Sequence, residues 1–137
     1  MQTINIERLR KLDYRANEAY KNLRTNIQLC GSDIKVIMLT STTPGEGKST
    51  VSFNLAVSLA EVVFSGPVPP NPTELLGNKV FKTLIKVLRD LYDYIIIDTP
   101  PIGSVIDSAI VAQECDGVAY VMAANDVSYK YAQKGLE

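Results

Sequence analysis

Histidine is absent from this sequence of 137 residues, and cysteine is rare. Without histidine the chain has no Ser-His or Cys-His nucleophile pair and no histidine metal site. We therefore expect Asp, Glu, Lys and bound Mg²⁺ to be the chemical tools of any reaction. Cys30 and Cys115 stand outside any C-x-x-C pair, which suits a reducing compartment and argues against structural zinc.

Long runs of one charge and long apolar runs are also missing. The net charge is -1, and no Lys/Arg run supplies the basic footprint that nucleic acid requires, so we expect no nucleic-acid partner. No stretch reaches the length of a membrane span, the start of the chain has no apolar signal core, and Gln2 stands where myristoylation needs a glycine. These absences predict a cytoplasmic protein.

The most informative run that is present has the form of a phosphate-binding loop. It follows the strand-like stretch 34–40 and precedes an apolar helix over 51–60. Glycines let the backbone curl so that successive N–H groups converge on an anion, and the helix N-terminus adds its dipole. The run matches the Walker A pattern except where Thr42 replaces a glycine. We predict that ATP or GTP binds through Pro44, Gly45, Glu46, Gly47, Lys48, Ser49 and Thr50.

Lys48 and Asp98 are the expected catalytic residues. Lys48 can reach the β- and γ-phosphates, and Ser49 offers a hydroxyl to Mg²⁺. The apolar run 94–98 has the form of a Walker B strand, and its final Asp98 can hold Mg²⁺ beside the phosphate loop. The alternatives are a flexible Gly/Pro turn for the loop and an ordinary strand-ending acid for Asp98.

Two helices are expected on either side of the phosphate loop. Residues 14–30 have helical spacing and stop at Gly31. After a proline-rich loop, a second helix is expected to begin at Pro72, with Asn71 as its cap and Glu74 completing a capping box. Its apolar face comprises Leu76, Val80, Leu84, Val87 and Leu91.

The last third of the chain continues the alternation of helix and strand. Ser104 and Asp107 form a capping box for a helix over 105–114, so we expect Asp107 to be structural. A strand at 117–124 and a helix over 129–137 follow. This order predicts an α/β fold of the P-loop NTPase type, with a mostly parallel sheet flanked by helices.

One domain is expected over residues 1–137. The length and a hydrophobic content of 46% fit a single globular unit with a real core. Within it, a helical N-terminal segment, 1–31, precedes a nucleotide-binding core, 32–137.

Four segments together resemble the bacterial tyrosine kinases of capsule and exopolysaccharide synthesis: EAYKNLRTNI, STTPGEGKST, GPVPPNPTELL and YDYIIIDTPP. The resemblance implies an autophosphorylating protein-tyrosine kinase that uses ATP and Mg²⁺. It assigns Lys48, Ser49 and Thr50 to Walker A and Asp98 to Walker B. It also implies a membrane-bound polysaccharide co-polymerase or activator as partner, which recruits the kinase to the inner face of the cell membrane.

The resemblance further implies a homo-oligomer. Glu18, Lys21 and Arg24 fall on the E-x-x-R-x-x-R motif of the family's oligomer interface. Lys21 departs from the motif, and lysine keeps the charge but loses the planar fork of arginine. The alternative is a solvated helix face with charges at three-residue spacing.

The chain departs from the family most strongly between Glu61 and Gly66. The family carries a Walker A′ strand with acidic residues there, and this chain has four residues in its place. A βαβ unit needs roughly 30 residues, so we infer an internal deletion that removes an acid expected to assist Mg²⁺ binding and tyrosine deprotonation.

Two further expectations follow from this departure. The lost segment is expected to expose apolar surface from Val51, Leu55 and Leu59. The chain also stops before a tyrosine-rich tail, and Tyr129 and Tyr131 near its end are read as packing or surface residues.

Three functions remain open at this point. The first is a tyrosine kinase that transfers the γ-phosphoryl group of ATP to a tyrosine hydroxyl. The second is a partitioning-type ATPase switch, whose signature lysine is missing because Thr43 stands at its position. The third is a nucleotide-binding module that lost its kinase activity with the deleted segment.

Overall fold

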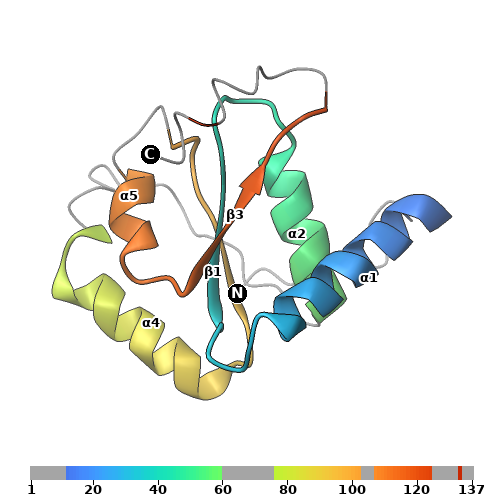
Figure 1. Cartoon of the computed structure of the whole chain (residues 1–137). Helices are drawn as coiled ribbons and strands as arrows, with labels where there is room; N and C mark the ends of the chain where they lie inside the picture. The colour runs from blue at the N-terminus through green and yellow to red at the C-terminus, as the bar shows by residue number, and fades with distance from the viewer. Residues whose placement is uncertain (1–11, 60–75, 103–106, 125–132, 134–137) are drawn as a thin grey trace, which may run out of the picture.

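A parallel sheet of three strands forms the centre of the protein. The computed structural model describes residues 12–59, 76–102, 107–124 and 133. The strands are β1 (Val36–Ser41), β2 (Ile95–Asp98) and β3 (Gly117–Val121), in the order β2-β1-β3. The helices are α1 (Tyr14–Leu29), α2 (Lys48–Leu59), α4 (Lys79–Leu91) and α5 (Asp107–Ala112). Helices α1 and α2 lie on one side of the sheet and α4 and α5 on the other (Figure 1), which confirms the α/β prediction.

Strand β1 is the most deeply buried element. All six of its residues are buried, because β1 pairs in parallel with β2 on one side and with β3 on the other. Its first four residues are apolar, as expected where helices cover both faces of a parallel sheet. Ile37 and Leu39 join Ile27 of α1 and Leu55 of α2 in one core cluster. Each such side chain contributes about 1.5–3 kcal/mol on burial.

Helix α1 confirms the first helix predicted from the sequence. Its N-cap, Asp13, accepts a hydrogen bond from the Ala16 backbone N–H at 2.7 Å. After the C-cap residue Cys30, Gly31 has a φ of +117°, a left-handed conformation that glycine adopts readily. The inward face of α1 buries Ile27, and Tyr20 and Leu23 pack beside it.

The expected exposure of α2 is wrong. Leu55 is fully buried, and Val51 and Leu59 are half-buried against the same core cluster. The reason is that β1 has neighbours on both sides and that α1 packs along α2. The deletion inferred from the sequence therefore leaves the layer of α1 and α2 covered.

Helix α4 corrects the prediction of a helix that begins at Pro72 and runs to Leu91. Gly77 and Asn78 are not helical, and Asn78 caps α4 through hydrogen bonds to the Val80 and Phe81 N–H groups at 2.8 and 3.3 Å. Because asparagine satisfies free N–H groups of a first turn, a new helix starts here. The predicted cap at Asn71, the loop before it and the helix at 129–137 lie outside the described residues, apart from residue 133.

The predicted apolar face of this helix also does not lie against the core. Ile85 is buried, whereas the row one-quarter turn away is exposed: Val80 70%, Leu84 50%, Val87 50% and Leu91 67%. We call these four residues the α4 stripe. Successive residues turn by about 100° around a helix, so the α4 stripe and the buried face of Phe81, Ile85 and Leu88 adjoin. None of the helices in the described part of the chain is long and apolar enough to cross a bilayer.

Asp116 ties three elements together at the amino ends of the strands. Its carboxylate accepts hydrogen bonds from the N–H groups of Lys35 and Val36 at 3.0 and 2.8 Å. The guanidinium of Arg89, near the end of α4, binds both carboxylate oxygens at 2.7 and 2.9 Å. The Arg89 hydrogen bonds, helped by the two backbone N–H groups, lower the pKa of Asp116 from 3.8 to about 2.

The lowered pKa of Asp116 predicts how stability depends on pH. Asp116→Asn should lower the free energy of unfolding at neutral pH by about 1 kcal/mol, a value reduced from the full pKa shift because the pair is partly exposed. A lowered folded-state pKa stabilises the fold above pH 3.8, and this contribution disappears as the pH falls through about 2. Urea denaturation should therefore show the wild type and Asp116→Asn converging in stability over that interval. Asp90→Asn on the exposed side of α4 is the matched control, and a constant difference between Asp116→Asn and the wild type at every pH would contradict the assignment.

Candidate functional site

The loop between β1 and α2 has the backbone conformation that phosphate binding requires. Gly45 and Gly47 have φ angles of +85° and +79°, and a Cβ atom added at either position would meet nothing within 4 Å. Glycine is therefore required here by the left-handed backbone and not by lack of space. Lys48 is the first residue of α2, and the first turn closes with a hydrogen bond from the Val51 N–H to the Gly47 carbonyl at 2.9 Å.

Side chains within the loop and from β3 brace this conformation. Ser41 donates to the Thr43 carbonyl at 2.9 Å, and Glu46 Oε2 accepts from the Thr43 N–H at 2.9 Å. The hydroxyl of Thr42 is hydrogen-bonded to the hydroxyl of Tyr120 on β3. Thr42 stands where the motif asks for glycine, and it fits because its buried side chain has this partner. Sequence reasoning missed Tyr120, because a tyrosine in an apolar strand gives no signal of such a contact.

The first turn of α2 presents the predicted phosphate-binding side chains to solvent. Lys48 is half-buried, and Ser49 and Thr50 are exposed. Free N–H groups at a helix N-terminus, together with an ammonium group and two hydroxyls, form a site for an anion. Of the predicted loop residues, Pro44 is exposed and Glu46 is buried. One carboxylate oxygen of Glu46, Oε1, has no hydrogen-bond partner within the described residues.

Asp98 lies at the end of β2 and contacts α2. Its Oδ1 atom accepts a hydrogen bond from Ser52 Oγ at 3.1 Å, and Ser52 Oγ also lies 3.0 Å from the Lys48 carbonyl. Because a serine hydroxyl has one proton, these two acceptors share it. Ser49, which was predicted to hold Mg²⁺ together with Asp98, is exposed on the first turn of α2. The side chain that contacts the Asp98 carboxylate is Ser52, one turn further along the helix. A serine three positions after Ser49, on the same helix side, is the sequence signal that identifies Ser52.

The segment after Asp98 is fastened to the carboxyl end of β1. Both the N–H and the hydroxyl of Thr99 donate to the Leu39 carbonyl, at 3.1 and 3.0 Å. The Thr40 hydroxyl donates in turn to the Pro100 carbonyl at 3.0 Å, and the Ile102 N–H donates to the Ser41 carbonyl at 2.9 Å. These bonds hold Asp98 beside the phosphate loop, as expected for parallel strands that end at one edge.

The donor set fits Mg²⁺ delivered together with phosphate. Within the described residues, no group of three or more Cys, Asp or Glu side chains could hold a metal ion. Mg²⁺ is commonly bound by one or two protein oxygens together with substrate phosphates and waters. The exposed Ser49 hydroxyl and the exposed Asp98 carboxylate supply oxygens of this kind.

Asp107 is buried at the start of α5. This placement agrees with a structural role. Its expected capping partner, Ser104, lies outside the described residues, as do Tyr129 and Tyr131.

The three predicted interface residues lie on α1, away from the loop. Lys21 pairs with Glu18 at 2.8 Å between exposed side chains. The Arg24 guanidinium donates to the Ser58 carbonyl at 3.0 Å, in the last turn of α2. A cation at a helix C-terminus is favourable, so Arg24 has a role within its own chain. The oligomer interface stays a prediction.

The glycine conformations predict a separable effect on binding. Gly45→Ala and Gly47→Ala should each lower the free energy of unfolding by about 1 kcal/mol and weaken ATP binding. Gly31→Ala is the matched control, since Gly31 also has a positive φ and open space around its added Cβ. It should lower stability and leave ATP affinity unchanged. Urea denaturation and titration calorimetry measure the two effects, and equal loss of affinity in all three variants would show that loop geometry is not the cause.

The chain is similar to bacterial tyrosine kinases. It is 37% identical over 192 residues to the tyrosine-protein kinase CpsD of Streptococcus pneumoniae, a match that covers 100% of this chain and 84% of that protein. CpsD of Streptococcus agalactiae is 35% identical over 176 residues, covering 90% of this chain and 77% of that protein. The kinase domain of the Escherichia coli tyrosine kinase ETK shares the fold, with a TM-score of 0.82, 23% identity and coverage of 97% of this chain and 77% of that one. No protein-family profile matches the chain.

The lengths of these matches bear on the inferred deletion. The pneumococcal match extends over 192 residues, whereas this chain has 137, so the relative has residues in the matched region that this chain lacks. An internal deletion produces such a difference, and the sequence places it between Glu61 and Gly66, outside the described residues. The identity and the coverage of the two streptococcal kinases show that the chain belongs to the bacterial tyrosine kinases of capsule and exopolysaccharide biosynthesis.

Proposed function

We propose that the loop formed by residues 44–50 binds Mg²⁺·ATP and that the γ-phosphoryl group is transferred to tyrosine hydroxyls. The observation that carries this proposal is the pair of left-handed glycines, Gly45 and Gly47, directly before the N-terminus of α2. Such a loop converges backbone N–H groups on a phosphate, and the family membership supplies the reaction. We propose that this kinase activity regulates the synthesis of capsule or exopolysaccharide, as the family membership implies.

Lys48, Ser49 and Asp98 have separate roles in this proposal. Lys48 neutralises charge on the β- and γ-phosphates, while Ser49 and Asp98 hold Mg²⁺, which supplies charge neutralisation on the phosphate oxygens. The phenolic oxygen of the acceptor tyrosine forms a bond to the γ-phosphorus as the bond from phosphorus to the ADP oxygen breaks. The phenolic proton passes to a carboxylate or to water. Ser52 positions the Asp98 carboxylate through its hydrogen bond.

We further propose that this chain is a weaker kinase than its relatives. The acid that we expect to assist Mg²⁺ and to receive the phenolic proton belongs to the segment that the chain lacks. Phosphoryl transfer depends on placing the metal, the acceptor and the γ-phosphate together, and one missing group costs orders of magnitude in rate. Nucleotide binding depends on the loop and on α2, whose elements are complete. A nucleotide-binding module that has lost its kinase activity is therefore the second candidate function.

The partitioning-type ATPase is the less favoured alternative. Such a switch needs a lysine at the position of Thr43, and threonine has no ammonium group to supply there.

The partners are proposed on the strength of the family. A membrane-bound co-polymerase or activator would recruit this cytoplasmic chain to the inner face of the membrane. Self-association through Glu18, Lys21 and Arg24 is the proposed route to a homo-oligomer, supported by the exposure of the Glu18–Lys21 pair. Arg24 would have to bind a second chain in addition to, or instead of, Ser58.

Removal of the lysine charge tests the nucleotide site. Lys48→Met should weaken Mg²⁺·ATP binding by about a hundredfold or more, because the loss of a charge-assisted contact to phosphate costs roughly 3 kcal/mol. Titration calorimetry on the whole chain measures the affinity. Lys86→Met on the exposed surface of α4 is the matched control and should bind as the wild type does. Equal affinity in Lys48→Met and the wild type would show that the nucleotide does not bind at this loop.

Restoring the missing segment tests the proposed weakness of the kinase. We expect autophosphorylation to be faster by about a hundredfold or more when the Walker A′ segment of a streptococcal relative is inserted after Glu61. Labelled ATP and phosphotyrosine detection on the chain and on an added partner measure the transfer. The control is the same insertion with its acids replaced by the matching amides. Comparable rates with and without the segment would show that the missing acid is dispensable.

A further inference from the structure

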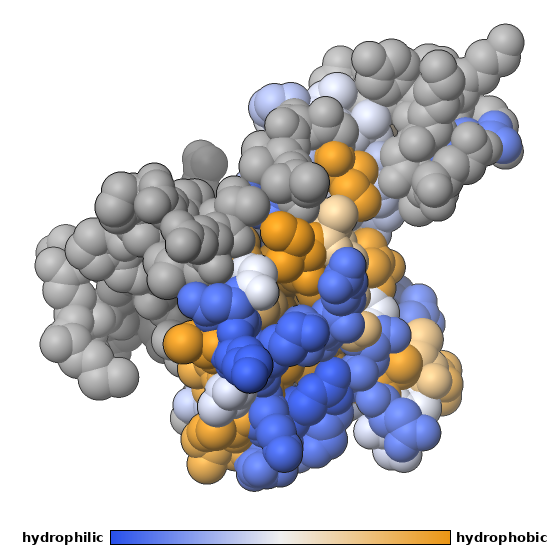
Figure 2. All heavy atoms as spheres, turned by 90° about the vertical axis from the view of Figure 1, so that its left-hand side faces the viewer, coloured by the Kyte–Doolittle hydropathy of each residue, from blue (hydrophilic) through white to orange (hydrophobic). Residues whose placement is uncertain are grey.

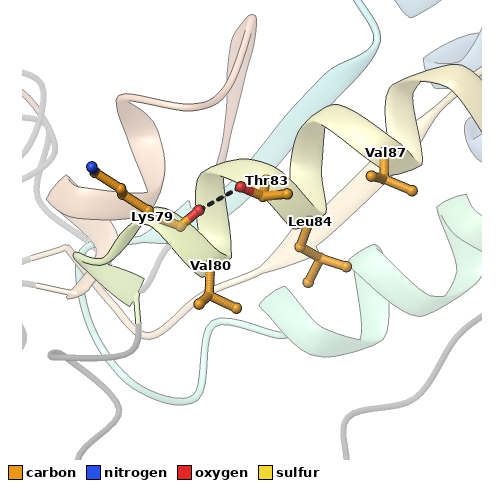
Figure 3. A pocket seen from close by; sticks show the side chains of 5 residues that line it. All are labelled: Lys79, Val80, Thr83, Leu84 and Val87. Carbon is orange, nitrogen blue, oxygen red and sulfur yellow. Dashed lines mark hydrogen bonds between the residues drawn. The ribbon is translucent and has the colours of Figure 1, made fainter.

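Helix α4 carries more apolar surface than its own core uses. Phe81, Ile85 and Leu88 face inward, and the α4 stripe (Val80, Leu84, Val87 and Leu91) adjoins them on the solvent side. Figure 3 shows Val80, Leu84 and Val87 projecting in a row from one side of the helix, with Lys79 and Thr83 completing an open hollow of about 410 Å³. Contiguous apolar patches of this kind mark interaction surfaces.

The spacing within the α4 stripe is that of a helix that packs against another helix. The four residues follow one another at intervals of four, three and four positions, the intervals of a coiled-coil seam. In that register the positions that flank the seam are Thr83 and Asp90 on one side and Phe81 and Leu88 on the other. The charged residue among these positions is Asp90, and Lys79 borders the hollow near the opposite end of the stripe. Two copies that meet antiparallel would therefore bring Lys79 of one copy toward Asp90 of the other.

Two other cations of α4 are paired with carboxylates of the same chain. Lys82 pairs with Glu114 at 2.9 Å and Arg89 with Asp116 at 2.7 Å. Figure 2 shows the side of the molecule that carries α4, with hydrophilic side chains gathered in a central patch and hydrophobic ones around them. The polar patch accounts for the solvent-exposed side of α4. The apolar α4 stripe is the side that a partner would cover.

Strand β2, which follows α4 in the chain, is an edge strand of the described sheet. Within the part of the chain that the structure describes, β2 pairs with β1 alone. Its residues Ile95, Ile96 and Ile97 are half-buried, in contrast to the fully buried β1. The α4 stripe ends at Leu91, and the short segment 92–94 joins it to β2. An unpaired strand edge with apolar side chains tends to pair with another strand.

We propose that the α4 stripe and the outer edge of β2, which has no partner strand within the described residues, together form an interface between two copies of this chain. A two-fold axis brings the same surface of each copy face to face, which places the two β2 edges antiparallel and the two stripes together. Both α4 and β2 come directly after the inferred deletion in the sequence. The residues that this chain lacks are therefore candidates for what covers these surfaces in the relatives. This interface is separate from the one predicted on α1 and does not depend on nucleotide binding.

Sedimentation equilibrium of the whole chain across a wide range of concentration tests the proposal. The wild type should reach at least twice the 15.0 kDa mass of one chain, and any association through α1 would add to this mass. Leu84→Lys should raise the dimer dissociation constant by about tenfold or more, because it places a charge in the seam. Leu29→Lys is the matched control, since Leu29 is 79% exposed on α1, and it should leave the mass unchanged. Circular dichroism confirms that each variant is folded.

Cysteine cross-linking locates the interface independently of the mass. Leu84→Cys and Val87→Cys, made with Cys30→Ser, should form disulfide-linked dimers under mild oxidation. Leu29→Cys in the same background should not. A wild type that stays monomeric at every concentration would overturn the proposal. So would a dimer that Leu84→Lys leaves intact, and Glu18→Ala with Arg24→Ala would then show whether α1 holds the copies together.

Discussion

The parallel pairing of β1 with a strand on each side is the constraint on which the rest of the structure depends. Backbone groups of a buried strand have no access to water, so each must find a partner in the sheet. β2 supplies partners along Val36–Leu39 and β3 along Ile37–Ser41. As a result the carboxyl end of β1 is held in place, and the phosphate loop leaves it from a fixed point. The position of the phosphate loop therefore depends on the pairing of the strands, and its conformation depends on its glycines.

Polar side chains reinforce this sheet at both ends. At the amino end Asp116 binds the first N–H groups of β1 and the guanidinium of Arg89. At the carboxyl end Thr99 and Thr40 fasten the segment after β2 to β1. The Thr42–Tyr120 hydrogen bond adds a link to β3. Each link joins residues far apart in the sequence, and together they set where Asp98 lies relative to α2.

The sequence predicted the features that local patterns determine. The helical spacing before Gly31, the apolar run of β1 and the glycines before Lys48 each act within a few residues. The structure confirms α1, β1 and a helix after the loop, although α2 begins at Lys48 and not at the predicted position 51. The contact of Asp98 with Ser52 and that of Thr42 with Tyr120 depend on how strands align, which spacing along the chain does not reveal. The catalytic and metal-binding roles stay predictions, since they concern ligands.

Burial was the property that the sequence predicted least well. Leu55 was expected to be exposed and is buried, whereas Leu84 was expected on the inward face of a helix and is half-exposed. The first error arises because the missing segment was expected to cover α2, whereas α1 packs along this helix. The second arises because apolar periodicity shows that a helix has an apolar side but not which neighbour covers it. For α4 the apolar arc is wide enough for two faces, and the position of Asn78 as the cap sets where the helix begins.

The placement of the missing segment explains how a shortened chain keeps a nucleotide site. The chain between α2 and α4 joins two helices on opposite sides of the sheet (Figure 1), and the elements that build the loop, β1 and α2, precede it. Loss of residues after Glu61 therefore leaves the strand, the glycines and Lys48 in place, and their closest contacts are to β2, β3 and α1. The cost falls instead on α4, which follows the shortened connection and carries the four exposed apolar side chains of the α4 stripe, and on β2, whose isoleucines are half-buried. Binding of a phosphate and completion of a catalytic set are thus built from different parts of the chain, and a deletion can remove the second without the first.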